Sequence, residues 1–397
     1  MITNFSVKNF KSIKHLELDL GRVNVFIGAN GSGKSNILEA FAFLSSLEND
    51  KIYNEKLISK GVRIAKPSLT ASAFAGSKED YKLEFSLTTD SNKDDKSIAD
   101  QFTFIPEQND KVNSIWVDAN PLELLAPDEL DDNKLEDSKL SYTELQKKMQ
   151  YLYTKSQRRM KKIRLFANLS TFVIYQPNAP ALRGMTNESH KEPLGIFGEN
   201  LDVLIANFSK EEQKNLDKYK NLVLWLADFF IDENNNLKLR GYSLNRSLSK
   251  LYFVDKFMRK KDLNNVFSAE NSNEGVLHIL FYLALLISKR TPPFFAVDNI
   301  ESSLNPHLCT HLMRTICQIA NEEQTKQMLI TTHNPAILDG LNLYDDNIRL
   351  FEVQRNDKGH TVARRIQYKK DIPRPSEGNF KLSELWTRGM FAIDDNF

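Results

Sequence analysis

Two adjacent side chains near the N-terminus, Lys34 and Ser35, have the types and the setting needed for nucleotide chemistry. They end the sequence Gly-Ala-Asn-Gly-Ser-Gly-Lys-Ser at residues 28–35, directly after the apolar, strand-like residues 23–27. This is the G-x-x-x-x-G-K-S pattern of a phosphate-binding loop, in which Lys34 would reach the β- and γ-phosphates and Ser35 would bind Mg²⁺. An ordinary glycine-rich turn would explain the glycines but not the adjacent lysine and serine. The sequence therefore predicts ATP and Mg²⁺ as cofactors.

The rest of this stretch supplies the surroundings of the phosphates. Glycines let backbone N–H groups turn inward around an anion, and residues 36–44 have the apolar spacing of a helix, whose N-terminus carries partial positive charge. The predicted nucleotide-binding residues of this stretch are Asn30, Gly31, Ser32, Gly33, Lys34, Ser35 and Asn36.

A second group of reactive side chains lies near the other end of the chain. Residues 294–297 form an apolar, strand-like run that ends at Asp298, which would hold the Mg²⁺ water shell beside the phosphate-binding loop. The alternative is an aspartate that caps the next helix. Residues 327–332 form another such run, ending at His333, which could reach a γ-phosphate or an attacking water. A lone histidine is more often a core residue, but this spacing after a carboxylate strand favours a site.

A third polar stretch, Asn-Ser-Asn-Glu-Gly at residues 271–275, comes just before an apolar helix that starts at Val276. A small polar residue and a glycine at a helix start expose N–H groups suited to an anion. We expect this stretch to lie too far from its own phosphate-binding loop to share a nucleotide. Ser272, Asn273 and Gly275 would then complete the site of a second copy.

Composition limits the function classes. The 397 residues include 53 Lys and Arg against 52 Asp and Glu, so nucleic-acid binding would need a local basic patch. Residues 147–164 are such a basic stretch, with Tyr151 and Tyr153 among the bases, although a solvated helix face or a partner-docking arm fits as well. The two cysteines lack metal or redox spacing, and we find neither a leader nor an apolar run long enough for a bilayer. We expect a cytoplasmic protein without membrane contact.

The periodicity predicts an α/β fold. Residues 1–20, 81–87 and 171–175 are expected to form strands, and residues 348–366 a hairpin. Between them we expect helices at 201–208 and 222–230 and strands at 237–242 and 251–254.

The order of these motifs resembles the ABC-type ATPases of the SMC and RecF group. Residues 9–12, with Lys11, are similar to that group's N-terminal signature, and residues 28–35 are similar to its Walker A loop. Asp298 resembles its Walker B carboxylate. Residues 302–305 resemble its D-loop, and His333 resembles its switch histidine. The resemblance implies an ABC-type P-loop ATPase head, a mixed sheet with flanking helices, with a mostly helical insertion. Residues 1–90 and 266–397 would form the head and residues 91–265 the insertion, and Lys11 would contact the nucleotide.

The sequence departs from the family pattern at three places. Either Asn273 or Ser272 stands where the family has a serine before the signature glycine. Asn299 follows Asp298, where the family usually has a glutamate that polarises the attacking water, so Glu301 is the candidate substitute. The glutamine of the Q-loop is either Gln101 or Gln176.

More narrowly, the chain resembles stand-alone OLD-like ATPases of bacterial anti-phage systems such as PARIS, Septu and some retrons. That resemblance implies a slow ATPase that pairs its heads with nucleotide and controls a separate effector, a nuclease in the simplest case. We expect no nuclease domain in the roughly 60 residues after residue 335. The alternatives are a RecF-like repair ATPase that binds duplex DNA and a scaffold that binds ATP without hydrolysing it.

Overall fold

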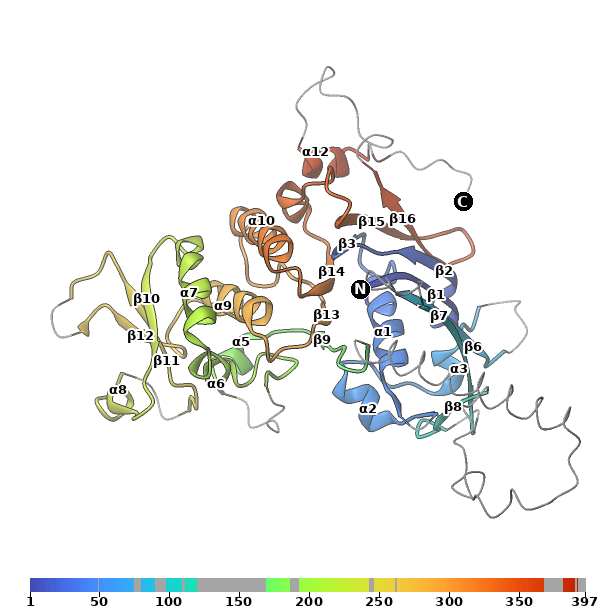
Figure 1. Ribbon diagram of the computed structural model, residues 1–397, viewed down its shortest axis with the longest axis horizontal. Coiled ribbons are helices and arrows are strands. Elements are labelled where there is room, and N and C mark those ends of the chain that lie inside the picture. The colour runs from blue at the N-terminus through green and yellow to red at the C-terminus, as the bar shows by residue number, and fades with distance from the viewer. Residues whose placement is uncertain are drawn as a thin grey trace, which may run out of the picture. The chain divides into compact units, whose positions relative to one another are not determined.

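The computed structural model describes residues 1–48, 50–74, 80–89, 98–108, 111–119, 169–185, 193–242, 246–260, 263–367, 381–389 and 391. The chain divides into two compact units, one formed by Met1–Asp19 and Ala40–Thr171 and the other by Leu20–Glu39 and Phe172–Phe397. Helix α1 (Lys34–Ser45) starts in the second unit and ends in the first (Figure 1). The acidic and basic stretches at residues 120–168 lie outside the described residues.

The first unit is built on an antiparallel seven-stranded sheet that packs against the C-terminal half of α1. Side chains alternate between buried and exposed along the strands, and the buried face is rich in aromatic rings. The rings of Phe5 and Phe41 stack with centroids 3.7 Å apart, and Phe43 stacks on Phe85. The strands, in spatial order, are β2 (Ile13–Asp19), β1 (Ile2–Phe10), β6 (Leu83–Thr89), β7 (Ile98–Pro106), β8 (Trp116–Asp118), β5 (Lys51–Ile52) and β4 (Leu47–Glu48). The short helices of this unit are α2 (Asn54–Ser59) and α3 (Pro67–Thr70).

The second unit contains a six-stranded sheet whose strands run parallel except for one edge strand. Strands β3, β13 and β14 are buried along their whole length, as expected for parallel strands covered on both faces. Because parallel strands end at the same edge, the residues that follow β3, β9, β13 and β14 meet there. The spatial order is β16 (Thr361–Ile366), β15 (Ile348–Arg355), β3 (Val23–Ile27), β14 (Gln327–Thr332), β13 (Phe294–Val297) and β9 (Ile174–Tyr175).

Helix α9 (Glu274–Ile287) is the centre of the second unit's core. Every residue of α9 from Gly275 to Ile287 is buried, so this helix is covered on all sides. Helix α10 (Pro306–Glu323) is amphipathic and lies beside the 3-10 helix η5 (Pro335–Gly340). The remaining elements are α5 (Ala179–Leu182), α6 (Leu201–Ala206), α7 (Lys210–Lys218), η3 (Lys220–Leu222), α8 (Asn236–Leu239), α12 (Leu382–Thr387) and a second sheet of β10 (Leu226–Ile231), β11 (Leu251–Asp255) and β12 (Val266–Ser268).

Two of the expected elements are wrong. Residues 222–230 were expected to be helical but form η3 and β10, because a bulge between Leu226 and Asp228 buries Leu226 and Phe229 at a helix-like spacing of three. Residues 237–242 were expected to be a strand but belong to α8 and its end. The side chain of Asp232 accepts hydrogen bonds from the backbone N–H groups of Asn236 and Leu237, which stabilises a helical turn there.

The predicted insertion also differs from the structure. Strand β7 pairs along its length with β6, so the sheet continues across the expected boundary at residue 90. The described part of residues 91–265 contains strands β7 to β11 as well as helices α5 to α8, and is therefore mixed rather than mostly helical. Residues 120–165, whose pattern contributed to the helical prediction, lie outside the described part.

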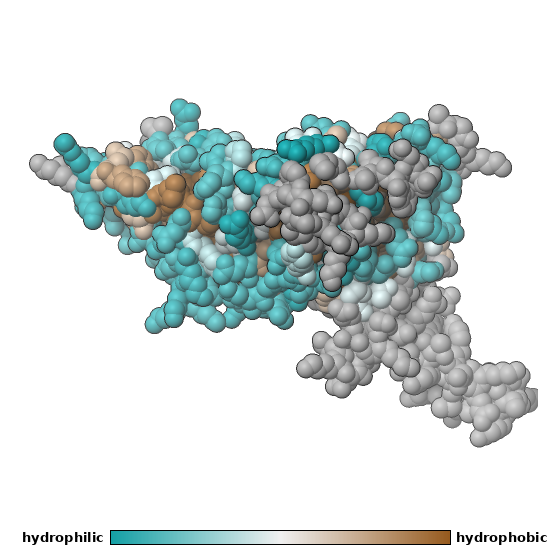
Figure 2. Space-filling view, turned by 90° about the horizontal axis from the view of Figure 1, so that it is seen from above, coloured by the Kyte–Doolittle hydropathy of each residue, from teal (hydrophilic) through white to brown (hydrophobic). Residues whose placement is uncertain are grey.

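The surface of the second unit carries exposed apolar side chains where β10, β11 and β12 lie. Figure 2 shows brown, hydrophobic residues gathered at that end of the molecule. Leu239, Phe257 and Met258 are among the exposed apolar residues of this region. No helix among the described residues is long and apolar enough to cross a membrane.

Candidate nucleotide-binding site

The glycine-rich loop leaves the end of buried strand β3 and closes directly onto helix α1. Gly31 and Gly33 have φ angles of +79° and +105°, a conformation that glycine adopts without strain. A Cβ at Gly33 would lie only 2.0 Å from the hydroxyl oxygen of Thr361, whereas a Cβ at Gly31 would meet nothing within 4 Å. Asn30 and Gly31 are exposed and Asn36 lies in the first turn of α1. The predicted loop therefore exists and has open space at its tip.

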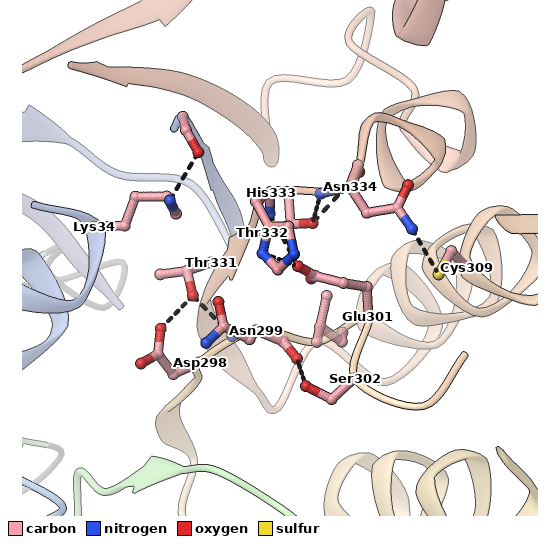
Figure 3. Close-up of polar contacts among 12 residues, drawn as sticks. Lys34, Asp298, Asn299, Glu301, Ser302, Cys309, Thr331, Thr332, His333 and Asn334 are labelled. Atoms are coloured by element: carbon pink, nitrogen blue, oxygen red, sulfur yellow. Dashed lines mark hydrogen bonds and ion pairs between the residues drawn. The ribbon is translucent and has the colours of Figure 1, made fainter. Parts of the chain in front are cut away.

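Lys34 lies over this loop. Its buried ammonium donates hydrogen bonds to the carbonyl oxygens of Gly28 and Ala29, at 2.8 and 2.9 Å (Figure 3). Burial lowers the pKa of Lys34, and the negative charges of Asp298 and Glu301 act in the opposite direction. A cation held at the mouth of a loop of backbone N–H groups suits a polyphosphate.

Asp298, directly after β13, is contacted by side chains from three separate segments of the chain. The hydroxyl of Ser35 donates to the two carboxylate oxygens of Asp298, at 3.2 and 3.0 Å. The hydroxyl of Thr331, in β14, also donates to this carboxylate (Figure 3). Gln176, directly after β9, donates from its amide nitrogen at 3.3 Å. A serine hydroxyl and a carboxylate in contact form the oxygen pair that Mg²⁺ prefers, so the residues present fit Mg²⁺.

The Q-loop alternatives are now separated by position. Gln176 lies at Asp298 in the second unit. Gln101 lies in β7, within the sheet of the first unit. The geometry favours Gln176.

The residues after Asp298 are arranged in an unexpected way. Asn299 is exposed, with a left-handed φ of +55°, and its backbone N–H donates to the Thr331 hydroxyl at 2.9 Å. Glu301 is buried, and its Oε1 accepts the backbone N–H of His333 at 3.0 Å and lies 2.6 Å from His333 Nδ1 (Figure 3). Its Oε2 is buried and has no partner among the described residues. A carboxylate with one buried oxygen, unpaired within the described part of the chain, therefore lies here even though position 299 holds an amide.

The start of α9 and the turn before α10 contact each other. The Asn273 side chain caps α9 by accepting from Gly275 N–H at 2.7 Å, and Asn273 is exposed. Ser272 is buried and donates its hydroxyl to the carbonyl of Ala269. The hydroxyl of Ser303 donates to the carboxylate of Glu274 at 3.1 Å, which joins the stretch at residues 302–305 to the stretch at residues 271–275. Of the two alternatives, Asn273 is the residue at the exposed helix start.

The family model described as "AAA domain, putative AbiEii toxin, Type IV TA system" matches residues 23–339. The chain belongs to this family. The match includes the loop, Asp298 and His333.

Three curated proteins are similar to short stretches of the chain. The chain is 39% identical over 66 residues to the DNA replication and repair protein RecF of Lactobacillus gasseri, a stretch covering 16% of this chain and 18% of that protein. It is 31% identical over 102 residues to the DNA double-strand break repair Rad50 ATPase of Saccharolobus solfataricus, covering 25% and 11%, and 31% identical over 117 residues to an ATP/GTP phosphatase of Helicobacter pylori, covering 28% and 30%. The matched stretches thus span less than a third of each of these relatives.

Solved structures show the fold. An SMC head bound to the C-terminal winged-helix domain of ScpA superposes with a TM-score of 0.57 at 15% identity, covering 93% of this chain and 99% of that chain. An SMC head with an extended coiled coil, bound to the C-terminal domain of ScpA from Pyrococcus furiosus, gives 0.51 at 15% identity, covering 93% and 97%. The fold is that of an ABC-type P-loop ATPase head.

One part of this ATPase site was missed by sequence reasoning. The C-terminal hairpin of β15 and β16 lies against the phosphate-binding loop: the buried Thr361 donates its hydroxyl to the carbonyl of Ser32 at 3.0 Å, and Arg355 donates to the carbonyl of Gly31 at 3.1 Å. The Ser32 hydroxyl itself is buried without a partner among the described residues. The sequence predicted the hairpin but offered no signal for its contact with the loop.

Lys11 lies in the first unit, at the turn between β1 and β2. Its backbone N–H donates to the carbonyl of Thr70 at 2.7 Å and its ammonium to the carbonyl of Arg63 at 3.2 Å. These contacts lie within the unit, and the predicted contact of Lys11 with nucleotide stays a prediction.

Proposed function

We propose that this ATPase is a slow, nucleotide-controlled switch: it binds Mg-ATP at the loop and Asp298, pairs with a second copy while ATP is bound, and separates after hydrolysis. The observation that carries the proposal is the combination of Lys34 over the glycine-rich loop and the Ser35–Asp298 contact with an amide, Asn299, next to Asp298. ATP supplies the phosphoanhydride that is cleaved. A site that binds well and cleaves slowly keeps its ATP-bound form long enough for another molecule to read it.

Slow cleavage follows from the water-activating side chains. An amide can position a water molecule but cannot accept its proton at neutral pH. Glu301 is the carboxylate that can accept it, through the unpartnered Oε2, while His333 holds Oε1. Because His333 Nδ1 faces Glu301, its Nε2 is the ring nitrogen left to meet a phosphate oxygen or a water.

The proposal is tested by the turnover of the purified chain. We expect ATP hydrolysis that Lys34→Ala abolishes and Asn299→Glu accelerates, because the added carboxylate stands directly after Asp298. Fast wild-type turnover that neither Lys34→Ala nor Glu301→Gln affects would contradict the assignment of the site.

Pairing of two copies is proposed for the start of α9. The helix start, where the exposed Asn273 caps α9 and Glu274 accepts a hydrogen bond from Ser303, offers N–H groups that the copy's own loop does not use. If the start of α9 faced the phosphates of a second copy, these N–H groups would donate hydrogen bonds to an anion. ATP would then lie between two heads, which links hydrolysis to assembly.

The biological role we propose is that of a sensor and regulatory subunit in a bacterial or phage anti-phage defence system, controlling a separate effector, a nuclease in the simplest case. The toxin system named in the family description supports this role. The exposed apolar side chains at β10–β12 are a surface that a partner could cover. Co-purification of an effector with the chain expressed from its native operon tests the role, and a chain that purifies alone in every nucleotide state would contradict it.

A RecF-like repair function is the second candidate, and the RecF and Rad50 relatives support it equally well. It predicts ATPase activity stimulated by duplex DNA, with affinity that falls steeply with salt. DNA binding that is strong and specific in the presence of ATP, without any partner protein, would favour this function over control of an effector. A chain that binds ATP but never hydrolyses it would instead indicate a scaffold.

A further inference from the structure

The second unit contains a cavity that is separate from the contacts of Lys34 and Asp298. It has a volume of about 710 Å³ and lies between α10, η5 and the residues at the start of α12. This volume is in the range of pockets that hold small molecules. The chemistry of its walls indicates what kind of ligand it would take.

The ionisable side chains of these walls are mostly basic. Arg314 and Lys381 line the cavity together with His307 and His311, and Asp339 is the acidic residue among them. Both carboxylate oxygens of Asp339 are already used, since they accept the backbone N–H of Ser383 at 3.0 Å and its hydroxyl at 2.8 Å. The basic side chains therefore outnumber Asp339, whose carboxylate already accepts hydrogen bonds from Ser383 in α12.

The two histidines form a pair one helical turn apart. Their Nε2 atoms are 3.2 Å apart, so the N–H of one ring donates a hydrogen bond to the other ring. Burial lowers the pKa of His311, and the nearby His307 and Arg314 lower it further. An anion placed against His311 would offset these effects and favour its protonated form.

We propose that this cavity is a binding site for a small phosphorylated anion, held by His307, His311, Arg314 and Lys381. Arg314 supplies a planar pair of N–H donors for phosphate oxygens. The two histidine rings supply up to two further N–H donors, close enough together to contact one phosphate group. Binding is coupled to proton uptake at His311, because the charged form of that ring is the one that meets the ligand.

The position of the cavity suggests its consequence, which rests on the ATPase function proposed above. Its walls include Asn334 and Pro335, directly after His333, and Pro306, directly after the turn at 302–305. The hydroxyl of Thr310 donates to the carbonyl of Ala336 at 2.7 Å and joins the two walls. A ligand that tightens these walls would act on the residues that carry His333, and so on the rate of ATP hydrolysis.

The test is a histidine NMR titration of the full chain with inorganic pyrophosphate. The side-chain resonances of His307 and His311, assigned from single His→Gln variants, are expected to move on addition of pyrophosphate, and the pKa of His311 is expected to rise. A rise of about one unit in the pKa of His311 corresponds to an affinity about fivefold higher at pH 6 than at pH 8. The exposed His15 of β2 is the internal control and should not move.

Variants separate this site from the nucleotide site. Arg314→Gln should abolish the shifts of His307 and His311, Arg314→Lys should weaken them, and Lys34→Ala should leave them intact. Failure of ATP hydrolysis would not change these shifts, so the two proposals fail independently. Pyrophosphate that leaves both resonances unmoved in wild type, or moves them equally in Arg314→Gln, overturns the site.

A metal ion is the competing ligand for two histidines. Two nitrogens on one tetrahedral zinc ion lie about 3.3 Å apart, close to the observed separation. Zn²⁺ that moves the two resonances in phosphate-free buffer, with no response to pyrophosphate, would show a cation site and contradict the proposal. Arg314 argues against that outcome, since its charge repels a cation at His311.

Discussion

The phosphate-binding half and the water-activating half of the nucleotide site are built in different ways. The first is one continuous loop whose donors are backbone groups and Lys34, fixed by the glycines and by the start of α1. The second is assembled from separate segments, and its carboxylate, Glu301, depends on His333 from the next strand end. A loop of backbone groups can bind a phosphate without the other half. Binding and cleavage should therefore be separable by mutation.

The largest effect is expected where the second half depends on one carboxylate. Glu301→Gln keeps the size of the side chain but removes the proton acceptor, so turnover should fall by about 10²–10⁴-fold while ATP affinity changes little. Steady-state hydrolysis and equilibrium ATP binding on the same preparation measure both. In the double variant Asn299→Glu/Glu301→Gln the new carboxylate should restore part of the turnover. Equal loss of binding and turnover in Glu301→Gln would show that the two halves are not separable.

The loop should lose binding when its cation is removed. Lys34→Ala is expected to weaken Mg-ATP binding by about a hundredfold or more, since a buried cation that meets the phosphates is lost. The matched control is Lys8→Ala, which removes an exposed ion pair with Glu84 worth about 1 kcal/mol at most. Undiminished ATP affinity in Lys34→Ala would mean that residues 28–35 do not bind phosphate.

The two glycines of the loop provide a finer comparison. In Gly31→Ala the new Cβ lies in open space. The substitution then costs only the free energy of holding an alanine in the left-handed backbone conformation, about 1–2 kcal/mol. Gly33→Ala has the same kind of strain and in addition a collision with Thr361, so it should weaken ATP binding much more. Calorimetric titration of both variants decides. Equal effects would mean that the hairpin does not press on the loop.

The smallest expected effect concerns the hairpin's hydrogen bond. Thr361→Val keeps the volume but loses the bond to Ser32, worth about 1 kcal/mol, so ATP affinity should fall about fivefold. Thr315→Val, which loses a similar bond inside α10, serves as the control and should leave ATP affinity unchanged. Equal ATP affinity in Thr361→Val and wild type would show that the hairpin does not position the loop.

The same contrast explains how far the sequence could predict the site. Residues 23–35 are contiguous, so strand, loop and helix could be predicted from the pattern alone, and the ends of parallel strands brought Asp298 and His333 to the same edge. The choice between Gln101 and Gln176 needed the pairing of β9 with β13, which no local pattern contains. The Glu301–His333 contact likewise joins residues from two strand ends.

Local chemistry also misled where tertiary structure decides. The bulge in β10 gave the buried residues of a strand the spacing expected of a helix. The alternating sequence at 237–242 predicted a strand, but hydrogen bonds to Asp232 stabilise a helical turn there. The contact of Thr361 with the loop joins residues more than 300 positions apart. Such long-range contacts leave no periodic signal, because each partner looks ordinary in its own segment.

The central claim, that bound ATP pairs two copies through the start of α9, is tested most directly by light scattering of the Glu301→Gln protein, which should hold ATP without cleaving it. The account predicts that its mass doubles when Mg-ATP is added, and that the further change Gly275→Glu prevents doubling, because a carboxylate would then oppose the phosphates held by the partner. ATP binding by the single chain should persist in that variant. The same mass in every nucleotide state, with ATP shown to be bound, would contradict the claim.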